Sequence, residues 1–201
     1  MKKLFAFSVV VLMLFTAYFY RVPDIDIPNV NDSVVLSPAD GTVEYITFSK
    51  DIEVFKDGNS YKLNISKYFP EGAYVIGIFM SPLDVHVNRA PVSGKVVYMK
   101  HIDGSFYPAF FNNVEKNNER NIMIIKANNG DYIGVVQIAG VVAKRCVYYV
   151  HVNDTVEVGE LIGKIKLGSQ TALILPKNYK ILVKVGEHVK GGKTIIAIRN
   201  N

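Results

Sequence analysis

The Gly168-Ser169 pair is the part of this sequence with the most direct chemical potential. It follows an apolar, strand-like run at residues 163–167, and it places a small nucleophile next to the peptide bond that precedes it. Because glycine has no Cβ, the Gly168 carbonyl is open to the Ser169 hydroxyl, and the backbone can adopt the strained turn that an acyl shift requires. Most Gly-Ser pairs form ordinary turns, so other parts of the chain must supply the remaining groups.

A carboxylate and an imidazole occur in two other turns between strand-like runs. Asp40 lies in the LSPADG stretch at residues 36–41, and His86 lies in the MSPLDVHVNR stretch at residues 80–89. A serine hydroxyl is a weak nucleophile and needs a base, so we predict that His86 is the base for Ser169 and that Asp40 orients its imidazole. Taken singly, Asp40 is typical of a turn and His86 of a buried, hydrogen-bonded histidine.

The three segments, in this order, resemble those of the phosphatidylserine decarboxylase family, in particular its short membrane-associated bacterial and archaeal members. The resemblance covers residues 30–180 and includes NERN at residues 118–121 and QIAG at residues 137–140. It implies supporting or substrate-binding roles for a further set of residues, namely Asp84, Arg89, Asn118, Glu119 and Arg120.

The resemblance also implies a cofactor made from the chain itself. Decarboxylation of an amino acid needs an electron sink, which no side chain supplies. In this family a covalent pyruvoyl group forms a Schiff base with the substrate amine. Autocatalytic serinolysis at Gly168-Ser169 would make that group from Ser169 and leave a β chain of residues 1–168 and an α chain of residues 169–201. The expected reaction converts phosphatidylserine, or archaetidylserine, to the ethanolamine phospholipid.

The sequence departs from the family pattern at two positions. Longer members carry a second histidine where this chain has Arg89, which leaves the proton donor of the decarboxylation step open. Many members have Ser, Thr or Arg directly after the nucleophile, where this chain has Gln170. The remaining histidines, at positions 101, 151 and 188, lie outside the matched motifs and receive no role. The lipid tail is also open, because the headgroup chemistry is the same for diacyl and for isoprenoid ether lipids.

A serine hydrolase with the same Asp-His-Ser triad is an alternative function. It predicts an intact 201-residue chain, and the sequence lacks the Gly-x-Ser-x-Gly elbow of such enzymes.

Two near-repeats give a second alternative. Residues 37–46 are similar to residues 90–99, and residues 155–165 are similar to residues 188–198. The second pair resembles the hammerhead turns of biotinyl- and lipoyl-carrier sandwiches, which favours a non-catalytic, carrier-like binding module. The chain lacks the lysine in a tight exposed hairpin that would accept the prosthetic group.

The composition predicts one globular domain with a substantial core, since 49% of the residues are hydrophobic and 20% are charged. The net charge of +5 favours an anionic partner. No Lys/Arg cluster interleaved with aromatic residues stands out, so we expect an anionic phospholipid membrane and no nucleic acid. The single cysteine, Cys146, lies in an apolar run, and no Cys/His spacing suggests a metal site. A homo-oligomer is compatible with the sequence.

Residues 1–23 are predicted to form a hydrophobic helix that anchors the protein. The run from Leu4 to Tyr20 carries no charge, and lysines precede it and Arg21 follows it. Such a helix is about 26 Å long against a hydrocarbon core of about 30 Å, so it spans only with snorkelling flanks or local thinning, or else lies partly inserted. A cleaved signal peptide is the alternative, but the run lacks a small-residue cleavage site and ends in three interface-belt aromatics at residues 18–20.

The orientation of this anchor is open. The positive-inside rule, applied to Lys2 and Lys3, keeps the amino terminus in the cytoplasm and sends the domain of a spanning chain outside. The family resemblance instead implies a domain at the cytoplasmic face of the cell membrane, and a monotopic helix that does not cross reconciles the two. Deletion of residues 1–21 is expected to release the protein from membranes and to leave self-cleavage intact.

After a proline-containing linker at residues 24–33, residues 34–201 are expected to form the catalytic domain. Short β-branched and aromatic runs alternate with turn signals, and no segment after the anchor shows a long 3.6-residue periodicity. The domain is therefore predicted to be mainly β, as a sandwich or barrel, with strand-like runs at residues 41–46, 74–79, 95–99, 122–125 and 132–138.

Overall fold

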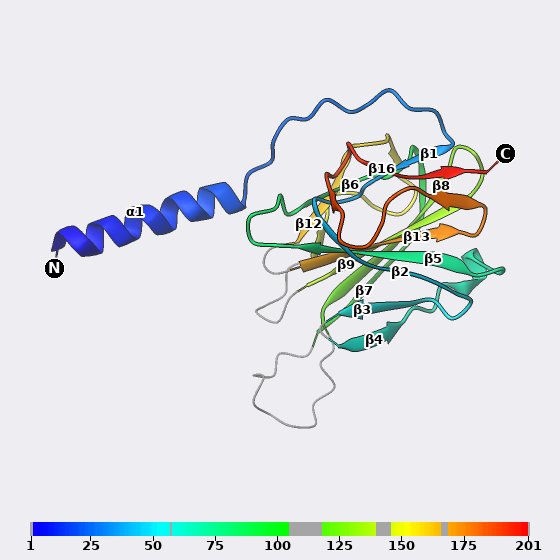
Figure 1. The fold of residues 1–201 in the computed structure, drawn as a ribbon, viewed down its shortest axis with the longest axis horizontal. Helices are drawn as coiled ribbons and strands as arrows, with labels where there is room; N and C mark the ends of the chain where they lie inside the picture. The colour runs from blue at the N-terminus through cyan, green and yellow to red at the C-terminus, as the bar shows by residue number, and fades with distance from the viewer. Residues whose placement is uncertain (1, 57, 105–117, 140–145, 166–168, 201) are drawn as a thin grey trace.

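A computed structural model describes residues 2–56, 58–104, 118–139, 146–165 and 169–200. One helix, α1 (Lys2–Phe19), precedes a β domain and points away from it (Figure 1). The strands of the described residues are β1 (Val34–Leu36), β2 (Gly41–Ser49), β3 (Glu53–Lys56), β4 (Asn59–Lys62), β5 (Ala73–Met80), β6 (Val87–Arg89), β7 (Gly94–Ile102), β8 (Arg120–Ala127), β9 (Tyr132–Ile138), β10 (Cys146–Tyr148), β11 (Thr155–Val156), β12 (Leu161–Ile165), β13 (Ser169–Pro176), β14 (Tyr179–Ile181), β15 (His188–Val189) and β16 (Ile195–Arg199), with a short 3₁₀ helix at Ser66–Tyr68. The prediction of a mainly β domain behind one hydrophobic helix is confirmed.

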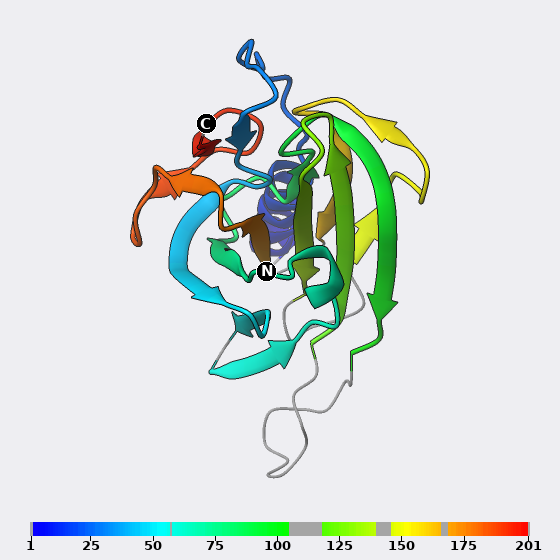
Figure 2. The same ribbon diagram turned by 90° about the vertical axis from the view of Figure 1, so that its right-hand side faces the viewer.

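The domain is organised around one antiparallel sheet of eight strands, in the order β11-β7-β8-β9-β13-β5-β2-β15. This sheet curls into a half-barrel (Figure 2). Two three-stranded sheets, β1-β16-β14 and β10-β12-β6, and the β3-β4 hairpin complete the fold.

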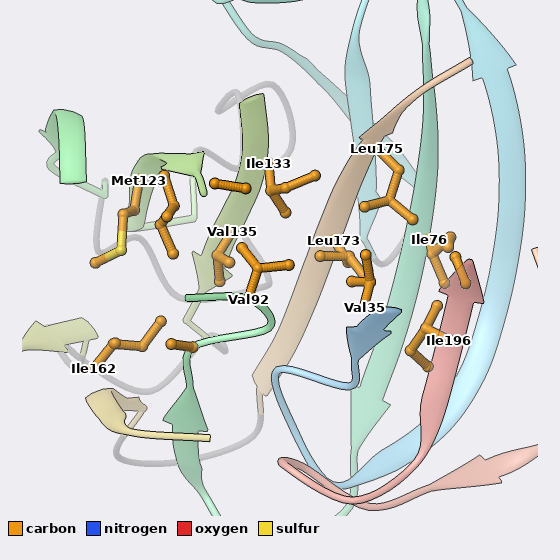
Figure 3. Close-up of a cluster of buried hydrophobic side chains, with 14 of the residues drawn as sticks. Val35, Ile76, Val92, Met123, Ile133, Val135, Ile162, Leu173, Leu175 and Ile196 are labelled. Carbon is orange, nitrogen blue, oxygen red and sulfur yellow. The ribbon is translucent and has the colours of Figure 1, made fainter. Parts of the chain in front are cut away.

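The central strands are apolar on both faces because both faces of the sheet are covered. On β8, Met123 and Ile125 belong to the core on one face of the sheet, whereas Ile122 and Ile124 belong to a second core on the other face. The first core includes Val135 and the inward side chains drawn in Figure 3. The second core is closed by residues of the β3-β4 hairpin and of the segment that follows it. Burial on both sides explains why these strands appear in the sequence as continuous apolar runs without clear alternation.

The near-repeats of the sequence occupy equivalent places at the two ends of the sheet. β2 pairs with β15 through Gly41↔Val189, and β7 pairs with β11 through Gly94↔Val156. A register shift follows in each half, between Val43 and Tyr45 in β2 and between Val96 and Tyr98 in β7.

The turns that precede these strands are matched as well. Gly192 N donates to the Ser37 carbonyl at 2.8 Å, and Gly159 N donates to the equivalent Ala90 carbonyl, also at 2.8 Å. The two repeats are therefore structural equivalents, while their likeness to carrier hammerheads stays a prediction.

Helix α1 carries its apolar side chains on its surface. Phe5, Phe7, Met13 and Leu14 are all exposed by more than half. Among the described residues, no helix has both the length and the hydropathy needed to cross a membrane.

Gly41 is a position where only glycine fits. Its φ is +148°, and a Cβ there would lie 2.2 Å from the Phe79 carbonyl oxygen, whereas Gly186, with φ +87°, has open space around it. Both Gly→Ala variants impose backbone strain of about 1–2 kcal/mol, but only Gly41→Ala must also push strand β5 away. We expect Gly41→Ala to lower the melting temperature well beyond Gly186→Ala, as measured by thermal unfolding; equal shifts would contradict this packing.

Candidate functional site

The motifs of the sequence converge at one end of the eight-stranded sheet. The strand register runs through one continuous row of paired residues, from Ile102 to Arg120, Ile138, Gln170, Phe79, Thr42 and His188. Each motif of the sequence contains or adjoins a member of this row. NERN contains Arg120 and QIAG contains Ile138, whereas Ser169 precedes Gln170, MSPLDVH follows Phe79 and LSPADG precedes Thr42. Segments far apart in the sequence are thus neighbours in space.

One loop at this end lies against the ends of two strands. It leaves β5 at Met80, enters β6 at Val87 and contains His86. The loop starts opposite Ser169, the first residue of β13, which pairs with Met80. It ends against Ile165, the last residue of β12, whose N–H donates to the His86 carbonyl at 2.9 Å. Gly168 lies outside the described residues, and only the backbone of Ser169 is described.

His86 is held with one ring nitrogen engaged and the other without a partner among the described residues. Nδ1 lies 2.9 Å from the Asp84 carbonyl oxygen, which can only accept, so Nδ1 carries the proton of the neutral ring. Nε2 is buried and makes no hydrogen bond with any described group. A buried nitrogen lone pair of this kind is what a general base needs.

Burial also keeps the imidazole neutral. The pKa of His86 is lowered from its ordinary value mainly because burial disfavours the charged ring. The Asp84 carbonyl, the Asp84 charge and the Asp40 charge oppose this shift, and the nearby Arg21 adds to it. The lowered pKa leaves Nε2 able to accept a proton at neutral pH.

Asp40 does not touch the imidazole. Its Oδ1 accepts a hydrogen bond of 2.8 Å from Gly191 N, and within the described residues no hydrogen bond or ion pair joins it to His86. Burial raises the pKa of Asp40, and the Gly191 N–H partly offsets the rise. Asp40 therefore acts on His86 through space, and its predicted orienting role stays a prediction.

The second half of the molecule has a counterpart to the Asp40 contact. Ser93 occupies the position equivalent to Asp40, and its Oγ accepts a hydrogen bond of 2.9 Å from Val158 N, which is the equivalent of Gly191 N. A side-chain acceptor thus caps the same turn in both repeats. The feature particular to the first repeat is that this acceptor carries a charge.

Asp84 and His188 form a second polar group beside the first. Asp84 Oδ2 accepts from Ser81 N at 2.7 Å, which fixes the turn before His86, and its Oδ1 lies 3.6 Å from His188 Nε2. His188 was assigned no role from the sequence, because no motif contains it. The signal that could have found it is its place in the second repeat, next to the strand that follows Asp40.

A cavity of about 390 Å³ opens beside these residues. Four cationic side chains and two carboxylates line it together with His188 and several apolar groups; the charged residues are Arg21, Arg89, Lys190, Lys193, Asp40 and Asp84. Arg89 is buried, and it donates to the Gly159 carbonyl at 2.9 Å and to the Pro23 carbonyl at 3.1 Å. Within the described part of the chain, no group of three or more His, Cys, Asp or Glu side chains could hold a metal ion.

Asn118, Glu119 and Arg120 lie at the same end of the sheet but do not line this cavity. Asn118 Nδ2 donates to the Ala139 carbonyl at 2.7 Å, and Glu119 Oε1 accepts from Cys146 N at 3.2 Å. The guanidinium of Arg120 lies over the Tyr61 ring, and burial lowers its pKa. The observed contacts of the three residues are with the protein itself.

A chain of buried amides connects the two sheets of the site. Asn121 donates to Gln137 at 3.0 Å, Gln137 donates to Asn88 at 2.8 Å, and Asn88 donates to the Thr171 hydroxyl at 2.8 Å. Asn88 is two residues after His86, and Thr171 is two residues after Ser169. The Asn88–Thr171 bond therefore ties β6, which directly follows His86, to β13, which begins at Ser169. Sequence analysis missed both residues, since a polar residue inside a strand gives no signal of its partner.

The fold is a mainly β domain with a buried histidine on a loop that starts opposite the first residue of β13, and comparison with known proteins shows its family. The sequence profile described as phosphatidylserine decarboxylase matches residues 12–197. A protein of Methanocaldococcus jannaschii named "Putative archaetidylserine decarboxylase proenzyme" is 63% identical over 98% of this chain and 96% of its own length. One of the same name from Methanothermobacter thermautotrophicus is 42% identical over 96% of this chain and 87% of its own. The phosphatidylserine decarboxylase proenzyme of Amoebophilus asiaticus is 40% identical over 94% of this chain and 78% of its own length.

The chain therefore belongs to the phosphatidylserine decarboxylase family. It is a decarboxylase that is synthesised as a proenzyme.

The Asn88–Thr171 bond gives a test of the site's assembly. Thr171→Val keeps the shape but leaves the Asn88 amide without this acceptor in the interior, which should cost about 1–3 kcal/mol in the free energy of unfolding and slow conversion of the precursor to two chains. Thr171→Ser keeps the hydroxyl, and Thr155→Val alters an exposed threonine, so both should behave like the wild type. Chemical denaturation and gel densitometry measure the two effects, and equal behaviour of all three variants would contradict the role of this bond.

Proposed function

We propose that the proenzyme cuts itself between Gly168 and Ser169 and then decarboxylates the serine headgroup of a membrane phospholipid. The observation that carries this proposal is the buried Nε2 of His86, which has no hydrogen-bond partner among the described residues. The loop that holds it starts opposite Ser169 and ends against Ile165. This arrangement supports a base beside the junction that the sequence marks for cleavage.

In the first step, His86 Nε2 takes the proton of the Ser169 hydroxyl. The oxygen bonds to the Gly168 carbonyl carbon, the carbon–nitrogen bond breaks, and His86 returns the proton to the Ser169 nitrogen. The two chains are then joined by an ester. Loss of the Ser169 Cα proton releases the Gly168 carboxylate and leaves dehydroalanine, which water converts to pyruvoyl with release of ammonia.

The pyruvoyl group, once formed, supplies the electron sink that amino acid decarboxylation requires. The residues around it suit that use. His86 and Asp84 lie on the loop beside the start of the α chain, and the same loop borders the charged cavity. The α chain itself contributes His188, Lys190 and Lys193 to the cavity wall, so both products of cleavage build it.

The cavity charges fit a serine phospholipid headgroup. That headgroup carries a phosphate and a carboxylate, both anionic, and one ammonium group. Arg21, Arg89, Lys190 and Lys193 offer cations for the anionic groups, and Asp40 and Asp84 offer carboxylates for the amine. With Arg89 bound to two backbone carbonyls, His188 is the titratable group of the cavity that we assign to proton donation after carbon dioxide leaves.

The exposed apolar surface of α1 supports attachment to the membrane that holds the lipid. We propose that the domain works at the cytoplasmic face. Two relatives are named as archaetidylserine decarboxylases, which favours an ether lipid as substrate. The third is named as a phosphatidylserine decarboxylase, which favours a diacyl lipid.

The proposal is tested by trapping the substrate on the chain. Purified wild-type protein, reduced with borohydride in vesicles that contain a serine phospholipid, should gain the lipid's mass on residues 169–201. Ser169→Ala and His86→Ala should remain full-length precursors without adduct or carbon dioxide release, whereas His151→Ala, which alters an exposed histidine, should process and react normally. An uncleaved wild-type chain that hydrolyses esters would instead favour the serine hydrolase.

Asp40 both accepts a hydrogen bond from Gly191 N and carries a negative charge, and a substitution can separate these two roles. Asp40→Ser should keep the hydrogen bond to Gly191 N, as Ser93 does in the other repeat, but remove the carboxylate. We expect its melting temperature to stay near that of the wild type while self-cleavage slows at least tenfold, and Asp40→Ala to lose both stability and cleavage. Full cleavage by Asp40→Ser would show that Asp40 is only a turn cap.

A further inference from the structure

Phe19 differs from the other aromatic residues of α1. Phe5 and Phe7 are 73% and 67% exposed, whereas Phe19, the last residue of the helix, is 3% exposed. The sequence placed it with Tyr18 and Tyr20 in a membrane-interface belt. That assignment does not describe Phe19, because its side chain is buried in the protein.

The group that buries Phe19 includes the proposed base. The ring centroids of Phe19 and His86 are 4.2 Å apart, with the planes tilted by 35°. Aromatic rings at this separation are in direct contact and exclude water from the shared face. His86 itself is only 3% exposed.

Tyr18 and Arg21, before and after Phe19 in the sequence, hold the end of the helix against the His86 loop. The Tyr18 hydroxyl and Arg21 Nη2 both donate to the Leu83 carbonyl, at 3.3 Å and 2.9 Å. Arg21 Nη1 also donates to the Tyr18 carbonyl at 2.8 Å, and its guanidinium lies 3.7 Å from the centre of the Tyr18 ring. The end of α1 is thus fastened to the loop that carries His86.

The chain after the helix continues along the site. Arg21, Pro23 and Ile25 line the charged cavity, while the residues between them are exposed. The Pro23 carbonyl accepts from buried Arg89. Residues 18–25 therefore form one wall of the site.

We propose that Phe19 is a positioning residue for His86, so that the end of the anchor helix is a built part of the self-cleavage site. Its ring holds the imidazole in place and keeps water away from it. This inference rests on the proposed function for its effect on cleavage, but the contact acts on His86 in the uncleaved chain as well. It also revises the expectation that deletion of residues 1–21 leaves self-cleavage intact, because that deletion removes Phe19 and Arg21.

The physical consequence is a change in the proton affinity of His86. Desolvation is the main cause of its lowered pKa, and Phe19 contributes to the burial. Among the described residues, the charges that act on the ring are those of Arg21, Asp84 and Asp40, and all three remain in a Phe19 variant. Removing the Phe19 ring should therefore raise the pKa of His86 toward its ordinary value, because the imidazole becomes better solvated.

The first measurement follows His86 directly in the full-length chain. A Ser169→Ala background keeps the precursor intact, and nuclear magnetic resonance of ¹⁵N-labelled histidines in detergent micelles reports protonation and tautomer of each ring. Phe19→Ala should raise the pKa of His86 and weaken the preference for Nδ1–H. Phe19→Tyr should restore the wild-type titration, and Phe7→Ala, an exposed phenylalanine of the same helix, should leave it unchanged. An identical His86 titration in Phe19→Ala and Phe7→Ala would overturn the inference.

The second measurement follows the rate of self-cleavage as a function of pH, with Ser169 present. Because a protonated ring cannot act as a base, the rate falls as the pH drops through the pKa of His86. Phe19→Ala should move this fall to higher pH and slow cleavage several-fold at pH 6. Phe19→Leu, which keeps apolar volume at the buried site, guards against loss of folding and should show a smaller shift in the same direction.

The two measurements separate the inference from the proposed function. A shifted titration without any cleavage in the wild type would keep the Phe19–His86 contact and reject self-processing. A slower Phe19→Ala with an unshifted pH profile and an unshifted titration would mean that Phe19 has a purely structural role, and would overturn the inference.

Discussion

The pairing of β13 with β5 and β9 is the constraint on which the site depends. Ser169 pairs with Met80, and Gln170 pairs with Phe79 on one side and Ile138 on the other. A shift of one residue would turn every side chain of β13 to the opposite face. The strand is buried on both faces, with Leu173 in one core and Ile174 in the other, so such a shift would disturb both. The register thereby fixes where Ser169, the residue of the proposed cleavage junction, lies along the chain relative to the His86 loop.

The internal repeat shows which residues distinguish the half that borders the cavity from the other half. The two halves share turn geometry, strand order and backbone hydrogen bonds, yet Asp40 and His188 in one half correspond to Ser93 and Thr155 in the other. At these positions the fold needs a side chain that accepts the turn hydrogen bond and a residue that pairs with the neighbouring strand. Asp40 with His188 and Ser93 with Thr155 both meet these needs. The charged cavity lies beside Asp40 and His188.

The sequence predicted the mainly β fold and the segments that meet at one end of the sheet, because short β-branched runs and motif resemblance are local signals. It did not predict that His86 Nδ1 binds the Asp84 carbonyl in place of the Asp40 carboxylate, since a backbone acceptor leaves no trace in residue identity. It gave no sign of the Asn88–Thr171 bond, which joins residues far apart in the chain. Phe19 was misplaced for a related reason: an aromatic residue at the end of an apolar helix fits a membrane interface as well as a buried contact, and only the tertiary structure distinguishes them.

We propose that the His86 loop and the start of β13 together break the chain at one bond and convert Ser169. Intact-mass spectrometry of the purified wild-type protein, combined with amino-terminal sequencing, is the decisive measurement. We expect two chains, one ending at Gly168 and one whose mass equals residues 169–201 with the serine replaced by pyruvoyl. The smaller chain should resist Edman degradation because it has no free amine. A smaller chain that begins with an unmodified serine, or a cut at any other bond, would contradict self-processing at this junction.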